Sequence, residues 1–383
     1  MHNTLLLAIV VTVALAFDFT NGFHDTANAV APTIATGALK PRTAVALSSL
    51  FNLVGAFLSL KVAATIASAL VAQNLVTLPV IFAGLIGAIA WNVTTWYFAI
   101  PSSSSHALIG GVIGAMLVLA GGHAVLWGGL ISKVIIPAGL APLVALVAAG
   151  VAVFFARRLT AKVDRDTSTW GFRVGQIGSS SLLSIAHGTN DAQKTMGVVT
   201  LALIANGTLS SNSSTPAWVV VSCAIAIAMG TFFGGWRIIR TMGHGFTQLT
   251  PQQGFAAQIA SSAVILTSSH MGLPLSTTHV ATGSIVGVGA ATPNQRVRWR
   301  LAGDVAMAWV ITLPAAGLFG AFSYYVAHLI GGTFGVAVLA LVAAGYVAIL
   351  MKRSRRHAVN ATNVNDLWGA PIVPIDASPV VAA

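Results

Sequence analysis

Long apolar runs interrupted by short polar stretches make up most of this chain of 383 residues. The first run, residues 4–39, is about 35 residues long, whereas a helix needs only about 20 residues to span a bilayer. A polar stretch, NGFHDTANAVA, occupies residues 21–31 near the end of that run. The pattern therefore predicts a membrane helix that is broken at this stretch.

The second half of the chain repeats the order of the first. Residues 174–206 form another run that is interrupted, here by HGTNDAQKTMG at residues 187–197. Both interruptions contain Gly-x-x-Asp, which places Asp25 and Asp191 at matching positions. Internal symmetry of this kind is typical of secondary transporters. We therefore predict two repeats, and we expect their topologies to be inverted because this arrangement places the Lys and Arg of the loops on one side of the membrane.

Each half also contains a pair of shorter apolar runs joined by a proline and hydroxyl side chains. The connections are PSSSS at residues 101–105 and PLSTT at residues 274–278, and each is followed by a histidine and a Gly-rich apolar segment. We expect each pair to enter the membrane and return. The sequence thus predicts two re-entrant helical hairpins with their tips at SSSSH and STTH.

The composition is that of an integral membrane protein. Hydrophobic residues make up 56% of the chain and charged residues only 7%, with a mean hydropathy of +0.85, whereas a soluble domain is about 25% charged. The predicted fold class is an all-α polytopic membrane protein with about 10 to 12 transmembrane segments. Its expected parts are a first repeat at 1–156, a cytoplasmic basic loop at 157–173, a second, inverted repeat at 174–332, an extra helix at 333–351, and a disordered cytoplasmic tail at 352–383.

Charge and cysteine content restrict the function further. The net charge is +11, but the positive side chains lie in short loops between apolar runs, so they indicate topology and not nucleic-acid binding. We expect a multi-pass protein of the plasma membrane with its N-terminus outside and its C-terminus in the cytoplasm. The single cysteine, Cys223, excludes a disulfide within the chain and a cysteine-based metal site.

The two Asp-containing stretches are the first candidate site. An acid at membrane depth is costly, and is by default a functional hypothesis. We expect Asp25 and Asp191 to bind or exchange a coupling cation, because carboxylate and amide oxygens suit Na⁺ or proton exchange. Asn21, Asn28 and Asn190 would assist them. The alternative is that these side chains merely cap helix ends.

Two neighbouring side chains leave more than one interpretation open. His24 precedes Asp25 and could take part in proton movement, or it could be a hydrogen-bonded spacer. Lys194 lies three residues after Asp191 and could neutralise that acid or attract an anion.

The hairpin tips are the second candidate site. Hydroxyls and free backbone N–H groups at a helix N-terminus form a ready anion site, although ordinary capping of a turn is the alternative. Two tips brought together from opposite faces would enclose an oxyanion with neutral donors. The histidines that follow, His106 and His279, would contact either substrate or backbone. The expected anion-binding residues are Ser103, Ser104, Ser105, Ser276, Thr277 and Thr278.

Together these four motifs resemble those of the inorganic phosphate transporter (PiT) family. NGFHDTANAVA and HGTNDAQKTMG are similar to its paired signatures, and SSSSH and STTH are similar to its hairpin tips. The resemblance covers both repeats. It implies a symporter that moves inorganic phosphate with Na⁺ or H⁺ by alternating access, often as a homodimer.

One position departs from the commoner family pattern. His24 stands where Asn usually precedes the first Asp. This variant resembles the bacterial low-affinity phosphate permease branch, which implies coupling to H⁺ and transport of a metal–phosphate complex.

Three other functions would use some of the same residues. Sulfate has the same shape as phosphate but does not change protonation near neutral pH. An anion channel would use the same hydroxyl donors without coupling to a cation. A hydrolase built on Ser105 and His106 is disfavoured because adjacent helical residues do not face each other. We therefore expect no enzymatic activity, no cofactor, and no metal apart from the coupling cation, with phosphate and membrane lipid as the partners.

Overall fold

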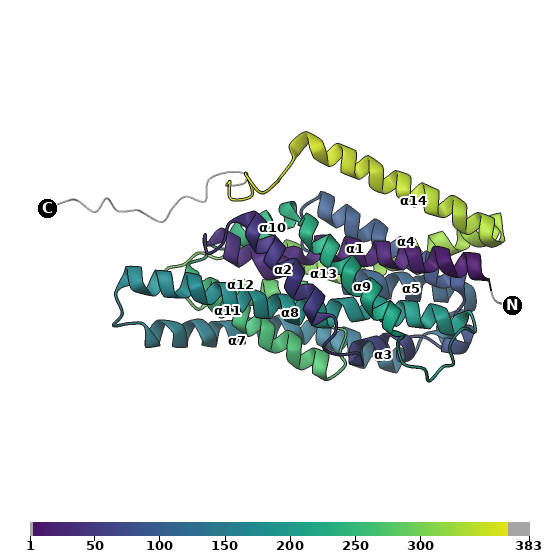
Figure 1. Cartoon of the computed structure of the whole chain (residues 1–383), viewed down its shortest axis with the longest axis horizontal. Coiled ribbons are helices and arrows are strands. Elements are labelled where there is room, and N and C mark those ends of the chain that lie inside the picture. Colours follow the sequence, from purple (N-terminus) through teal and green to yellow (C-terminus); the bar gives the residue numbers. More distant parts are fainter. Residues whose placement is uncertain (1–2, 367–383) are drawn as a thin grey trace.

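The computed structural model describes residues 3–366 of the chain, and these residues fold into packed α-helices (Figure 1). The helices of the first half are α1 (Thr4–Ala35), α2 (Pro41–Gly55), α3 (Lys61–Ser68), α4 (Leu78–Tyr97), α5 (Ser104–Ala120), α6 (Trp127–Leu130) and α7 (Ile136–Leu159). Those of the second half are α8 (Arg165–Ala205), α9 (Ala217–Phe233), α10 (Trp236–His244), α11 (Pro251–His270), α12 (Thr277–Ala290), α13 (Trp299–Ile330) and α14 (Gly332–Ser354). Short turns of 3₁₀- or π-helix occupy Gln73–Leu75, Gly122–Ala124, Ile131–Ile135 and Arg355–His357.

Within the described residues, five helices are long and apolar enough to cross a membrane, or six if the bent pair α9 and α10 is one span. These helices confirm a polytopic all-α membrane protein. The expected 10 to 12 segments exceed this number of full-length apolar helices. The reason is that α2, α3 and α5 are short, while α8 carries many polar side chains along its 41 residues.

The expected breaks at the two Asp-containing stretches are not present. Residues 21–31 lie inside α1 and residues 187–197 lie inside α8, and both helices are continuous there. Their polar side chains find partners on neighbouring helices, so the backbone keeps its own hydrogen bonds. A pronounced bend occurs elsewhere, between α9 and α10, whose axes differ by 67°.

Both predicted hairpins are present as pairs of packed helices. α4 and α5 form the first and α11 and α12 form the second. In each pair the returning helix begins at a hydroxyl cap. Ser103 accepts a hydrogen bond from the backbone N–H of His106 at 3.1 Å, and Ser276 accepts one from that of His279 at 3.3 Å.

α1 runs through the centre of the molecule (Figure 1). It packs against α4, α8, α9 and α10, while α8 packs against α2, α3 and α11 as well. α1 and α8 therefore bring the two Asp-containing stretches together in the core. α14 lies along the edge of the bundle, over α4 and α13.

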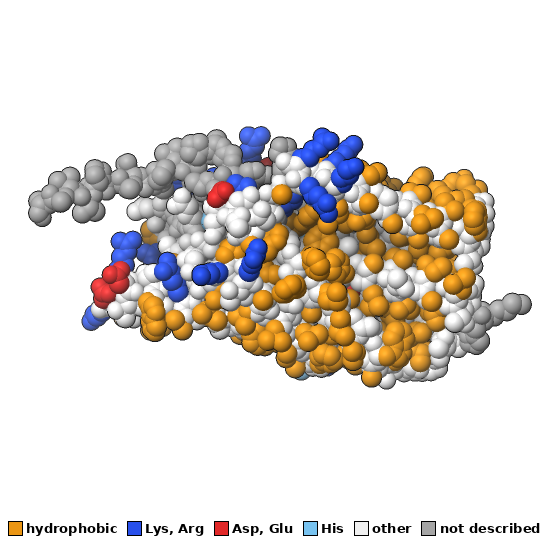
Figure 2. Space-filling model, turned by 45° about the horizontal axis from the view of Figure 1, so that its top comes forward, with side chains coloured by type: hydrophobic (Ala, Val, Ile, Leu, Met, Phe, Trp, Pro, Cys, Tyr) orange, Lys and Arg blue, Asp and Glu red, His pale blue; other side chains and the backbone are white. Residues whose placement is uncertain are grey.

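The surface divides into an apolar and a basic part. Figure 2 shows a broad hydrophobic surface over one end of the molecule, with Lys and Arg side chains gathered toward the other end and along the top. The start of α1 lies at the end away from the basic side chains (Figure 1). A separate apolar surface and basic surface are typical of a membrane protein whose Lys and Arg side chains lie on one side of the bilayer.

Part of the predicted disordered tail is ordered. α14 continues to Ser354, and residues 358–366 fold back against the body. Val364 is only 1% exposed, and its burial accounts for this order despite the polar composition of the segment. Residues 367–383 of the predicted tail lie outside the described residues.

Close helix packing depends on glycine. At Gly114 of α5, an added Cβ would lie 1.9 Å from the carbonyl oxygen of Gly317 on α13. Small residues at such crossings let two membrane helices approach to backbone contact.

We predict that Gly114→Ala destabilises the protein by about 1–3 kcal/mol, the usual cost of overpacking a core. The midpoint of thermal unfolding of the purified protein in detergent measures it. Gly303→Ala is the matched control, because a Cβ at Gly303 of α13 meets no atom within 4 Å. Equal midpoints for the two variants would contradict the proposed packing constraint.

Candidate functional site

Two carboxylates meet at the contact between α1 and α8. Asp25 and Asp191 are 2% and 0% exposed, and their ligand atoms, with a ring nitrogen of His187, all lie within 4.8 Å of one another. The residues that sequence symmetry paired are thus neighbours in the fold.

The glycine of each Gly-x-x-Asp stretch allows this approach. A Cβ at Gly22 would lie 2.3 Å from the carbonyl oxygen of Ile227 on α9, and one at Gly188 would lie 2.2 Å from that of Asn52 on α2. Each glycine therefore lets a further helix pack directly against the helix that carries the acid.

Asp25 is held by one histidine and two hydroxyls. His24 Nδ1 lies 2.6 Å from Asp25 Oδ1. Ser104 of the first tip donates to Asp25 Oδ2 at 2.7 Å, and Thr278 of the second tip donates to Oδ1 at 3.3 Å. Both hairpin tips thus reach the same carboxylate.

Asp191 is held by a lysine, a histidine and a hydroxyl. Lys194 donates to Asp191 Oδ1, and His187 Nε2 lies 3.0 Å from Oδ2. Thr277 donates to Oδ2 at 3.0 Å. The lysine therefore forms an ion pair with this acid.

All three N–H bonds of the Lys194 ammonium group are used. Besides Asp191, it donates to Ser105 Oγ and, at 2.8 Å, to the carbonyl oxygen of Leu275. The side chain is 1% exposed. Lys194 thus ties α8 to both hairpin tips.

Of the three predicted asparagines, Asn28 joins the cluster directly. Its Nδ2 donates to Thr277 Oγ1 at 3.2 Å and to Thr278 Oγ1 at 3.0 Å. Asn190 instead donates to Ser269 Oγ at 2.9 Å. Within residues 3–366, the side-chain carbonyl oxygens of these two residues and of Asn21 accept no hydrogen bond although they are buried. They are oxygens that a cation could use.

The predicted cation and anion sites therefore form one cluster. Ser104, Thr277 and Thr278 donate to the carboxylates and Ser105 accepts from Lys194. The other two predicted tip residues, Ser103 and Ser276, have a different role, because their hydroxyls cap α5 and α12.

Sequence reasoning missed several members of the cluster. His187 could have been found, since it lies one helical turn before Asp191, on the same face of α8. Thr95 and Ser102, which lie 3.1 and 3.4 Å from His24 Nε2, carry no such signal. They meet His24 only because α4 and α5, whose connection carries Ser102, pack against α1.

The tip histidines line an apolar cavity of about 570 Å³ that also includes Trp309. The His279 ring stacks on Trp309 with the ring centres 4.1 Å apart, and His279 Nδ1 lies 3.2 Å from the carbonyl oxygen of Ala138. For His279, the backbone contact is the alternative that the structure supports.

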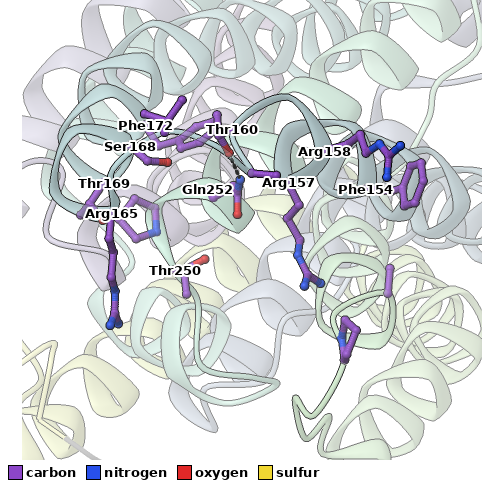
Figure 3. Close-up of a pocket in the computed structure, with 15 residues that line it drawn as sticks. Phe154, Arg157, Arg158, Thr160, Arg165, Ser168, Thr169, Phe172, Thr250 and Gln252 are labelled. Atoms are coloured by element: carbon purple, nitrogen blue, oxygen red, sulfur yellow. Dashed lines mark hydrogen bonds between the residues drawn. The ribbon is translucent and has the colours of Figure 1, made fainter.

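A larger cavity, of about 860 Å³, lies at the basic end, where Arg157, Arg158 and Arg165 point around its rim (Figure 3). It shares no residue with the carboxylate cluster.

Comparison with known proteins decides the family. A model described as the phosphate transporter family matches residues 21–320. The chain belongs to the phosphate transporter family. This confirms the resemblance drawn from the four motifs, which all lie within the matched residues.

Curated relatives of the same family cover nearly the whole chain. A protein of Mycobacterium leprae named probable low-affinity inorganic phosphate transporter is 56% identical over 96% of this chain and 89% of its own length. A protein of Bacillus subtilis with the same name is 42% identical over 86% of this chain and 100% of its own length. Both relatives are thus named as transporters.

A solved structure shares the fold. It is described as the sodium-dependent phosphate transporter, and it superposes with a TM-score of 0.73 at 24% identity, covering 85% of this chain and 100% of the other.

The ion pair gives a first prediction for the cluster. Lys194→Met should destabilise the protein by about 3–5 kcal/mol, because it leaves a buried carboxylate without its cation. Thermal unfolding in detergent measures the loss, with Lys61→Met as the control because Lys61 is exposed at the start of α3.

Adding Asp191→Asn to Lys194→Met removes the uncompensated charge, so the double variant should regain stability. A double variant no more stable than Lys194→Met alone would show that the carboxylate does not need the lysine.

Proposed function

We propose that the chain is a symporter that imports inorganic phosphate together with a coupling cation. The observation that carries the proposal is that two buried carboxylates and the hydroxyls of both hairpin tips share one cluster. Asp25 and Asp191 would bind or exchange the cation. Phosphate would accept hydrogen bonds from the hydroxyl groups of the tips, which belong to Ser104, Ser105, Thr277 and Thr278. Ser103 and Ser276 would hold the tips in place by capping them.

Charge compensation explains why one cluster would serve both ions. Phosphate carries one or two negative charges near neutral pH, and an isolated anion is strongly disfavoured in a low-dielectric interior. A cation held by Asp25 and Asp191 would offset that charge, and Lys194 would add a fixed positive charge. Loading the two ions together would therefore be easier than loading either alone.

The coupling ion in this proposal is either Na⁺ or H⁺. The likeness to a protein described as sodium-dependent supports Na⁺, for which carboxylate and amide oxygens are suitable ligands. The 2.6 Å contact between His24 and Asp25 supports H⁺, since a histidine paired with an acid can pass a proton. Of these two, we propose H⁺ as the coupling ion.

The cargo could also be a metal–phosphate complex. Asp25, Asp191 and His187 offer two carboxylates and an imidazole within 4.8 Å, a set that suits a divalent cation. In this version the metal ion is part of the substrate.

Alternating access would move the hairpin tips relative to the other helices. We propose the two inverted repeats, the homodimer, and the placement of the N-terminus outside and the C-terminus in the cytoplasm as parts of the same hypothesis. The basic end of the molecule (Figure 2) supports this orientation under the positive-inside rule.

Uptake by purified protein in liposomes tests the coupling. Asp25→Asn should lower gradient-driven accumulation of radiolabelled phosphate by more than about tenfold, equivalent to about 1.4 kcal/mol. H⁺ and Na⁺ gradients are imposed separately, and Asp166→Asn is the control because Asp166 is exposed in the first turn of α8. Accumulation by the unaltered protein under neither gradient would refute symport.

The hydroxyls give a separate test. Ser104→Ala and Thr277→Val should each raise the KM for phosphate roughly tenfold, because a hydrogen bond to a charged group contributes about 1.5–3 kcal/mol. Ser103→Ala is the control and should lower stability with little change in KM, since Ser103 acts as a cap. An unchanged KM in both tip variants would remove the tips from phosphate binding.

A further inference from the structure

A third acid, Asp18, is buried in the core of the bundle and belongs to neither Gly-x-x-Asp stretch. It lies on α1 and is 0% exposed. Neither of its carboxylate oxygens has a hydrogen-bond partner among residues 3–366. A buried carboxylate without partners is strongly disfavoured in its charged form, so a positive charge has to reach it.

Within residues 3–366, no lysine, arginine or histidine forms an ion pair with Asp18. Lys194 is a buried cation that acts on Asp18, but its three N–H bonds already go to Asp191, Ser105 and Leu275. The other titratable groups that face Asp18 are the acid Asp191 on α8 and the thiol of Cys223 on α9. α4, which also packs on α1, carries no acid, lysine, arginine or histidine.

Two polar side chains lie beside Asp18, Asn21 on α1 and Thr195 on α8, and each has a buried oxygen without a hydrogen-bond partner among residues 3–366. The hydroxyl of Thr195 is unusual for this helix. Thr189 and Thr200 donate to carbonyl oxygens one turn back along α8, each at 2.8 Å, but Thr195 makes no such bond. Its oxygen is therefore free for a partner outside the helix.

The three side chains offer oxygens and a single formal negative charge. Asp18 lies two helical turns before Asp25, or about 10 Å along the axis of α1. Asp18, Asn21, Asp25 and Asn28 follow one another at spacings of three and four residues, so they form one polar stripe on α1. The unpaired group thus adjoins the carboxylate cluster, whose Asp191 and Lys194 act on Asp18.

We propose that Asp18, Asn21 and Thr195 form a second binding position for a small monovalent cation, H⁺ or Na⁺. One negative charge selects a monovalent over a divalent ion, because a divalent ion would leave an uncompensated positive charge in the core. The role of this position in coupling rests on the proposed symport function, whereas binding itself does not.

Binding is tested on purified protein in detergent without phosphate. Infrared difference spectroscopy detects H⁺ as the C=O stretch of a protonated carboxylic acid, and ²²Na⁺ binding detects Na⁺. We expect Asp18→Asn to lose one protonated acid or one bound Na⁺, while Asp304→Asn, which alters an exposed acid, loses neither. An Asp18→Asn protein unchanged in both measurements would overturn the proposal.

Coupling is tested in liposomes under tenfold H⁺ or Na⁺ gradients. Each coupled cation multiplies the accumulation of phosphate by about ten under such a gradient, so Asp18→Asn should accumulate about tenfold less phosphate. Its exchange of internal for external phosphate should persist, which also shows that the variant is folded. Accumulation equal to that of the unaltered protein would overturn the coupling role.

A second variant covers the case in which Asp18→Asn does not fold. Thr195→Val removes one oxygen and leaves the acid in place, so uptake should need a several-fold higher H⁺ or Na⁺ concentration for half-maximal rate. Thr200→Val is the matched control, since Thr200 bonds within its own helix. An identical cation dependence in both variants would count against the site. If the unaltered protein shows no gradient-driven uptake, symport fails, and the binding measurements still decide the site.

Discussion

The burial of charged side chains at the contact between α1 and α8 is the constraint on which the other contacts in the core depend. Two carboxylates in a low-dielectric interior repel each other and lose their hydration. The protein compensates with Lys194, with His24 and His187, and with the hydroxyls of Ser104, Thr277 and Thr278. These partners come from four helices, α1, α5, α8 and α12, so the helices have to pack closely around one point.

Close packing is made possible by glycine and by short helices. Gly22 and Gly188 let α9 and α2 reach the backbone of the two helices that carry the acids. α5 and α12 begin in the core of the molecule, so their first residues can reach the carboxylates. Each helical hairpin places the N-terminus of its second helix in the core. The cap serines, Ser103 and Ser276, accept hydrogen bonds from backbone N–H groups there.

The formal charges of the core are consistent with a protein that carries cations. Asp18, Asp25 and Asp191 bring three negative charges and Lys194 brings one positive charge. An excess of negative charge in a buried site favours the binding of cations. Bound cations reduce that excess. A phosphate ion would then meet hydroxyl donors beside neutralised acids, which is how a cation and an anion can assist each other's binding.

The sequence by itself determined the class of protein and the family, and it selected candidate site residues. Apolar runs and low charge require a membrane protein, and Asp25, Asp191 and the tip hydroxyls could be selected because each motif occurs twice. Only the tertiary structure decided that α1 and α8 continue through their motifs, that the expected cation and anion sites are one cluster, and that Ser103 and Ser276 act as caps. It also revealed the environment of Asp18, which no repeat marks. The physical reason is that a polar side chain forms hydrogen bonds with whichever groups helix packing brings next to it. The order of residues along the chain does not show which groups these are.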